Sequence, residues 1–179
     1  MPRLNVVERE TATGKQKELL DAAHAKLGTV PNIFKGMANS PAVLEAYFAF
    51  TGALEGANLD AGTREQIALA VGQANRCDYC VAAHTAIGKG AGLDDDTMVS
   101  ARKGEASDPK TAALLKFVTN FVENRGWAED SEVQELRDAG FTDAEVAEIP
   151  AVVAVNIFTN YFNHLNETEV DFPVPAKVD

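Results

Sequence analysis

Apolar residues recur at intervals of three and four along most of this 179-residue chain. An early instance is the set Leu19, Leu20, Ala23 and Leu27, with Gly28 directly after it. Such spacing places the apolar side chains on one face of a helix, and glycine commonly ends a helix. Alternation of apolar and polar residues, which marks a half-buried strand, occurs over no useful length. The sequence therefore predicts an all-α fold with no parallel sheet.

Capping residues, glycines and prolines divide this pattern into segments. Proline suits the first turn of a helix, and Asp or Thr caps a helix start. We expect a helix ending at Gly28, a loop around Pro31, and helices over about 41–54, 60–71, 77–88, 94–103, 109–122, 129–139 and 142–162. Pro150 lies inside the last segment and is expected to kink or restart its helix.

We expect one all-α domain over residues 1–179, with a cysteine-containing half over about 41–104, a degenerate second half over about 108–167 and an extended tail over 168–179. A faint internal sequence similarity, called here the internal echo, connects the two halves. When EQIALAVG is laid over EIPAVVAV, Cys77 and Cys80 fall on Asn160 and Asn163. The echo indicates a helical hairpin present twice, although amphipathic helices alone also produce such echoes.

The charge balance narrows the range of partners. The net charge is −11 and the sequence pI is about 4.7, which argues against nucleic acid and against an anionic membrane surface. No stretch approaches the ~18 apolar residues of a membrane span, and the N-terminus has no signal-peptide core. Two cysteines do not make a disulfide framework. We therefore expect a cytoplasmic protein with no nucleic-acid or membrane partner.

Four residues form the constellation with the clearest chemistry. Cys77 and Cys80 make a C-x-x-C motif, His84 follows four residues later, and Glu65 lies twelve residues upstream of the motif. On a helix, positions 77, 80 and 84 share one narrow stripe, and an i, i+3 pair is close enough for a disulfide. His84 can move a proton, and Glu65 can orient His84 or act as a base through a water. This pattern favours redox chemistry.

The start of the expected cysteine helix supports a reactive thiol. Asn75 is the expected cap, and Arg76 together with the positive end of the helix dipole favours thiolate over thiol.

Two other interpretations of the cysteines stay open. They can be inert core residues next to a surface histidine. Alternatively, Cys77, Cys80 and His84 can ligate zinc with Glu65 as a fourth ligand, although structural zinc sites usually draw ligands from two elements. The aromatic group at Tyr47 and Phe48 can line a substrate pocket, but at helical spacing it is more typical of core or subunit interface.

The spacing E-x11-C-x2-C-x3-H resembles that of the AhpD-like alkylhydroperoxidase family within the carboxymuconolactone decarboxylase superfamily. The likeness covers roughly residues 30–173, with flanking support from segments 31–47, 64–71 and 75–93. It implies an all-α fold that assembles into trimers or hexamers, in agreement with the helical periodicity.

The resemblance also implies roles for the four residues. Cys80 would attack a hydroperoxide and become a sulfenic acid, and Cys77, expected to be the more exposed, would resolve it into a Cys77–Cys80 disulfide. His84 and Glu65 would relay protons. An external dithiol, in the best-understood members a lipoyl-bearing protein, would reduce the disulfide without any cofactor or metal. Tyr79 stands where some members have a histidine, which bears on the reductant and the rate.

Two other functions remain as alternatives on the same fold. One is a decarboxylase- or isomerase-like lyase that uses Glu65 and His84 as acid and base. The other is a non-catalytic redox sensor whose disulfide alters its assembly. In each case we expect a homo-oligomer, whether dimer, trimer or hexamer.

Overall fold

The computed structural model describes residues 1–178, and over that range it contains nine α-helices and no strand. The prediction of an all-α fold is confirmed. The helices are α1 (Gly14–Leu27), α2 (Asn32–Met37), α3 (Pro41–Leu54), α4 (Ala61–Ala74), α5 (Asp78–Gly90), α6 (Asp95–Arg102), α7 (Pro109–Glu123), α8 (Asp130–Asp138) and α9 (Asp143–Asn166).

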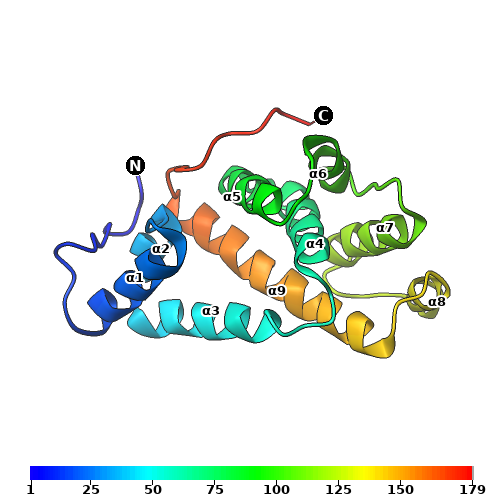
Figure 1. The fold of residues 1–179 in the computed structure, drawn as a ribbon, viewed down its shortest axis with the longest axis horizontal. Coiled ribbons are helices and arrows are strands. Elements are labelled where there is room, and N and C mark those ends of the chain that lie inside the picture. Colours follow the sequence, from blue (N-terminus) through cyan, green and yellow to red (C-terminus); the bar gives the residue numbers. More distant parts are fainter. Residues whose placement is uncertain (179) are drawn as a thin grey trace.

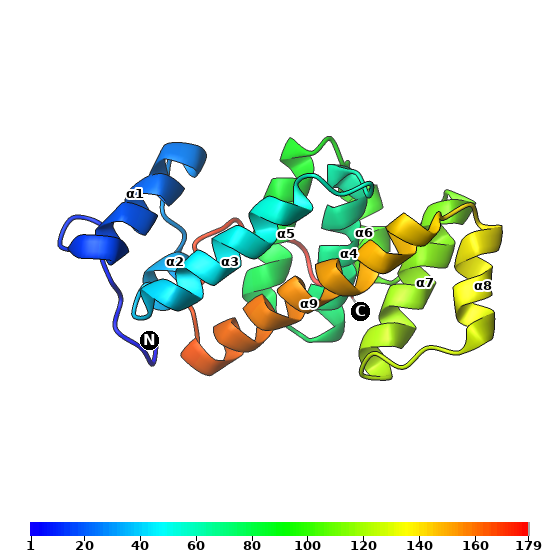
Figure 2. The same ribbon diagram turned by 90° about the horizontal axis from the view of Figure 1, so that it is seen from below.

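The long helix α9 crosses the molecule and organises the other helices around it (Figure 1). Helices α1 and α2 lie toward its C-terminal end, and α7 and α8 lie toward its N-terminal end. Figure 2 shows α3 running beside α9. Helix α4 packs against α5, α6, α7 and α9, so it is the central element of the cysteine-containing half.

Two apolar clusters form the core. One gathers side chains of α4, α7 and α9, with Ile67, Leu114 and Ile149 fully buried. The other joins α1, α2 and α3 to α5, and it includes both cysteines. The C-x-x-C motif is therefore built into a core cluster rather than onto the surface.

Local capping signals set most helix ends as expected. Gly28 ends α1 with a φ of 74°, in the left-handed region that glycine adopts readily. The Asp60 carboxylate accepts a hydrogen bond of 2.8 Å from the Thr63 backbone N–H and so caps α4. The Thr142 hydroxyl caps α9.

One local expectation was wrong: the segment after Pro31 is the six-residue helix α2 and not a loop. Of the two outcomes expected at Pro150, a kink or a restart, the restart does not occur, because α9 continues from Asp143 to Asn166. Ile149 and Val152 beside the proline are buried in the core, and this packing holds the chain helical despite the missing N–H.

The echo between the halves does not produce a second hairpin. The positions aligned with the turn at residues 75–77 are 158–160, and they lie inside α9. The first turn needs Arg76 at a φ of 56°. The aligned residue is Thr159, and a β-branched side chain disfavours that left-handed conformation.

Residues 167–178 have no regular secondary structure and pass over α2 and α5 toward α6 (Figure 1). The Asn32 backbone N–H donates to Asp171 Oδ2 at 2.7 Å, and an Arg102 guanidinium N–H donates to the Ala176 carbonyl at 2.7 Å. The part of the expected tail at residues 168–178 thus covers the cysteine helix α5. Residue 179 lies outside the described residues. Over residues 1–178, no helix combines the length and the apolarity needed to cross a bilayer.

Candidate functional site

The site is built on the turn that joins α4 to α5. Helix α4 ends at Ala74, Arg76 adopts its positive φ, and Cys77 is the N-cap of α5. The Cys77 sulfur accepts the Cys80 backbone N–H at 3.3 Å, as a Ser or Asp oxygen does at an ordinary N-cap. The prediction that Asn75 caps α5 was wrong. Asn75 instead caps the end of α4.

The two cysteines form a disulfide, with their Cα atoms 5.3 Å apart. This separation lies within the usual range for disulfides. Cys77 is only 1% exposed and Cys80 only 2%. The expectation that Cys77 would be the more exposed was therefore wrong. As the N-cap it faces the core, where Phe162 and Phe172 pack against the cluster that contains it.

A histidine–glutamate pair lies beside the disulfide. Glu65 Oε2 on α4 and His84 Nδ1 on α5 are 2.7 Å apart, and both side chains are less than one-fifth exposed. His84 is one helical turn beyond Cys80, so the two side chains point to the same face of α5. The structure thus forms two pairs among the four predicted residues, Cys77–Cys80 and Glu65–His84, with His84 one helical turn beyond Cys80. The bond at Nδ1 leaves Nε2 as the ring nitrogen for a second partner.

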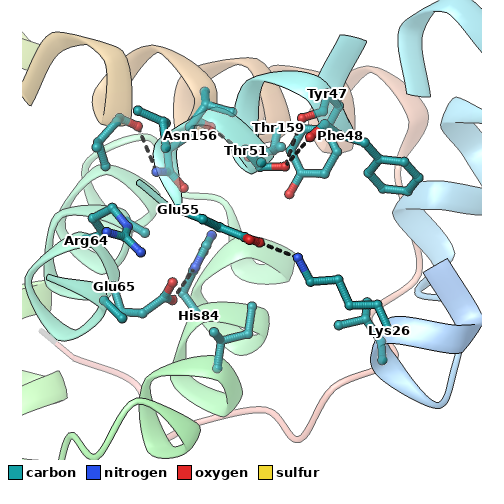
Figure 3. A pocket seen from close by; sticks show the side chains of 18 of the residues that line it. Lys26, Tyr47, Phe48, Thr51, Glu55, Arg64, Glu65, His84, Asn156 and Thr159 are labelled. Atoms are coloured by element: carbon teal, nitrogen blue, oxygen red, sulfur yellow. Dashed lines mark hydrogen bonds and ion pairs between the residues drawn. The ribbon is translucent and has the colours of Figure 1, made fainter. Parts of the chain in front are cut away.

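A cavity of about 570 Å³ opens beside this pair. Residues of α1, α2, α3, α4, α5 and α9 line it, including Glu65 and His84 but neither cysteine. Figure 3 shows the Glu65–His84 pair on one wall, with Tyr47 and Phe48 away from it and a Lys26–Glu55 ion pair between them. A volume of this order is typical of small-molecule sites.

Two aromatic residues of α3 shape the apolar part of this cavity. Tyr47 and Phe48 line it and also pack on Phe34. Burial, together with the negative charge of Glu65, raises the pKa of Tyr47 to about 12, so its hydroxyl stays neutral at physiological pH. The sequence pattern favoured core or interface for these residues, whereas the structure gives them a cavity wall as well.

The sequence did not single out Asn163 as a contact of the sulfur pair. Its side-chain N–H donates to Cys80 Sγ at 3.3 Å and lies 4.0 Å from Cys77 Sγ. Beside it, Asn160 accepts a hydrogen bond from Asn75 at 2.8 Å. The available signal was a row of asparagines at helical spacing on an otherwise apolar face of α9: Asn156, Asn160, Asn163 and Asn166, all buried.

Tyr79, between the two cysteines, makes structural contacts. Its side chain is buried, and its hydroxyl oxygen accepts the Ile33 backbone N–H at 3.2 Å. Its ring meets that of Phe172 edge-on, with centroids 5.6 Å apart. Burial raises the pKa of Tyr79, which keeps the phenol protonated. Tyr79 therefore fastens α2 and the C-terminal segment to α5.

A metal site has no support from the arrangement of side chains. Across residues 1–178, no three His, Cys, Asp or Glu side chains are grouped so that they could hold a metal ion.

Comparison with known proteins gives a consistent result. Residues 41–115 match the model of the carboxymuconolactone decarboxylase family. A stretch of 45 residues is 53% identical to an uncharacterized protein of Haemophilus influenzae (strain ATCC 51907 / DSM 11121 / KW20 / Rd), and it covers 25% of this chain but only 40% of that relative.

Solved structures resemble the chain over nearly its whole length. An uncharacterized peroxidase-related protein from Ralstonia eutropha JMP134, with an alkylhydroperoxidase AhpD core, is 27% identical with a TM-score of 0.86, covering 95% of this chain and 92% of that one. A peroxidase-related protein from Silicibacter sp. TM1040 is 24% identical with a TM-score of 0.78, covering 92% and 86%. A cysteine-to-alanine variant of the debrominase Bmp8, in complex with 2,3,4-tribromopyrrole, shares the fold at 18% identity and a TM-score of 0.78, covering 96% and 94%.

Proposed function

We propose that this chain, which belongs to the AhpD-like group of the carboxymuconolactone decarboxylase superfamily, is a cysteine-based peroxidase that reduces organic hydroperoxides. The observation that carries the proposal is the placement of a Cys77–Cys80 disulfide one helical turn from the hydrogen-bonded His84–Glu65 pair. A redox-active sulfur pair beside a proton relay is the minimal equipment for this chemistry.

The chemistry balances with an external dithiol as the electron source. The Cys80 thiolate attacks the O–O bond of the hydroperoxide, which leaves a sulfenic acid on Cys80 and releases an alkoxide that takes a proton from His84. The Cys77 thiol then attacks the sulfenic sulfur, forms the disulfide and releases water. Two electrons and two protons from an external dithiol restore both cysteines, while the donor becomes a disulfide.

The cavity favours an organic substrate. Its volume of about 570 Å³ exceeds what hydrogen peroxide needs, and Tyr47 and Phe48 provide apolar surface. Glu65 and His84 in its wall give a peroxide oxygen a nearby proton source. We therefore propose alkyl or aryl hydroperoxides as the substrate class.

Stopped-flow oxidation of the reduced protein tests the proposal, with cumene hydroperoxide compared with hydrogen peroxide. We expect Cys80→Ser to lose all turnover. The matched variant Cys77→Ser should form one sulfenic acid per chain, which dimedone traps, and then stop. Full turnover by Cys80→Ser would overturn the mechanism.

A second candidate is a lyase that uses Glu65 and His84 as acid and base. One observation favours it: the cavity wall contains this pair but neither sulfur. The double variant Cys77→Ser/Cys80→Ser separates the candidates, because it abolishes peroxidase activity and leaves a lyase active. A third candidate, an oligomeric redox sensor, requires that particle size differ between the oxidised and reduced protein.

A further inference from the structure

The sulfur pair is contacted from outside its own helix by Asn163 of α9. The amide nitrogen lies 3.3 Å from Cys80 Sγ and 4.0 Å from Cys77 Sγ, and the side chain is 4% exposed. The orientation of the amide follows from chemistry, because the reversed amide would set its carbonyl oxygen against the lone pairs of the disulfide. Asn163 is thus a fixed N–H donor directed at the more C-terminal sulfur.

The other end of the same amide is unsatisfied. Asn163 Oδ1 is buried and has no hydrogen-bond partner among the described residues. A buried carbonyl oxygen without a donor is unfavourable and uncommon in folded proteins. The disulfide cannot supply that donor, since neither sulfur carries a proton. A reduced pair can.

Reduction changes the sulfur pair in the way this amide requires. An external dithiol breaks the Cys77–Cys80 bond with two electrons and becomes a disulfide itself, releasing two protons. If one proton stays on a cysteine, the pair becomes one thiolate, which accepts hydrogen bonds, and one thiol, which donates them. Asn163 offers an N–H donor to Cys80, and the same amide, whose nitrogen lies 4.0 Å from Cys77 Sγ, has a carbonyl oxygen with no partner.

We propose that Asn163 holds the reduced pair in one protonation state, with its N–H on a Cys80 thiolate and its carbonyl oxygen accepting the S–H of Cys77. The inference rests on the proposed function in taking Cys80 as the attacking thiol. It explains why two buried cysteines on one helix take different roles. Asn163 would also shift the redox equilibrium toward the dithiol, because only the reduced pair gives both the N–H and the carbonyl oxygen of its amide a hydrogen-bond partner.

The charged and titratable groups around the pair come from several elements. They are Asp78, Tyr79 and His84 on α5, Glu65 on α4, Tyr47 on α3, and Arg76 in the preceding turn. Asn163 is neutral, so replacing it leaves all of these charges in place. A change in thiol acidity on replacement therefore reports the hydrogen bond itself.

The test uses the full-length reduced protein with Asn163→Leu, which is similar in volume but cannot hydrogen-bond. The matched control is Asn160→Leu, since Asn160 is equally buried on the same face of α9 but bonds Asn75. Thiolate absorbance at 240 nm, followed with pH, gives the thiol pKa. Equilibration with dithiothreitol gives the redox constant.

For Asn163→Leu we expect the pKa of Cys80 to rise by about one to two units, as for loss of one hydrogen bond to a charged group. The equilibrium constant for reduction should fall about tenfold, which corresponds to about 30 mV. Asn160→Leu should change neither quantity. If leucine does not fit, Asn163→Ala carries the same expectation.

Two results would overturn the inference: unchanged pKa and redox constant in Asn163→Leu or Asn163→Ala, or equal shifts in Asn160→Leu. Neither measurement uses a hydroperoxide, so the inference and the peroxidase proposal fail separately. If Asn163→Leu shows the expected shifts in thiol pKa and redox constant but the unaltered protein turns over no hydroperoxide, only the peroxidase proposal is contradicted. If the unaltered protein turns over hydroperoxide but Asn163→Leu shows neither shift, only the role of Asn163 is contradicted.

Discussion

Glu65 and His84 are nineteen positions apart in the chain, yet Glu65 Oε2 and His84 Nδ1 are separated by 2.7 Å. The contact joins the two helices on either side of the cysteine turn and forms part of the cavity wall. A carboxylate at Nδ1 fixes the ring and sets which nitrogen is left for proton transfer. Because both side chains are largely buried, water screens the interaction weakly.

Replacing Glu65 with glutamine should slow the oxidation of Cys80 by cumene hydroperoxide about 100-fold, the low end of what positioned acid–base groups contribute. Glutamine keeps the shape of the side chain but removes the negative charge beside the His84 ring. The matched control is Glu55→Gln, which removes a carboxylate from the same cavity, where it pairs with Lys26. Stopped-flow rates should separate the two variants, and equal rates in Glu65→Gln and the unaltered protein contradict the relay.

Gly52 offers a way to reduce the cavity without disturbing the sulfurs. It lies on α3 in the cavity lining, and a Cβ built there meets no atom within 4 Å. Gly52→Leu should therefore fold and fill part of the space. We expect about a tenfold lower kcat/KM for cumene hydroperoxide, comparable to the cost of a methylene or two in a pocket. The rate with hydrogen peroxide should not change; a parallel loss for both peroxides would place the substrate elsewhere.

Loss of the Tyr79 hydroxyl should act on stability. In Tyr79→Phe the Ile33 backbone N–H loses its buried acceptor, which should lower the free energy of unfolding by about 1–3 kcal/mol. Tyr161→Phe is the control, because Tyr161 is 62% exposed. Urea unfolding of both variants measures the difference. Equal midpoints would mean that the Ile33 N–H finds another partner.

Alkaline pH should destabilise the protein partly through Tyr47. The folded-state pKa of Tyr47 is raised to about 12, with burial as the main cause, against about 10 in an unfolded chain. Below pH 10 Tyr47 is protonated in both the folded and the unfolded state, and its contribution to stability is fully present. Between pH 10 and 12 the unfolded state loses its proton first, so stability falls as pH rises.

Tyr47→Phe removes this titrating group. We expect the variant to lose less stability than the unaltered protein between pH 10 and 12, as followed by thermal unfolding at each pH. Parallel curves for the two proteins would contradict the assignment to Tyr47.

Features fixed by local chemistry were predictable from the sequence. Gly28, Pro41 and Asp60 mark helix ends because a cap depends only on neighbouring residues. The proximity of Glu65 to His84 was predictable for a similar reason. A short turn forces α4 and α5 to pack side by side, which brings a residue near the start of one close to the middle of the other.

Features set by distant packing were not predictable. Cys77 is buried because α9 and the C-terminal segment cover the start of α5. The residues near position 77 in the sequence do not predict this burial. Asn163 stood in a visible row of asparagines, but only the packing of α9 on α5 decides which amide meets a sulfur. The catalytic roles of Cys77, Cys80, His84 and Glu65 stay predictions.

Because the disulfide is buried, two rates in the proposed cycle are distinct: the rate at which the sulfurs become accessible and the rate at which they react. A folded carrier protein cannot reach sulfurs that are 1–2% exposed unless the structure around them opens locally. Regeneration would then saturate with carrier concentration at the frequency of that local opening. Weaker packing over the sulfurs would accelerate recycling and leave their intrinsic reactivity unaltered, so local opening and not the thiols would govern steady-state throughput.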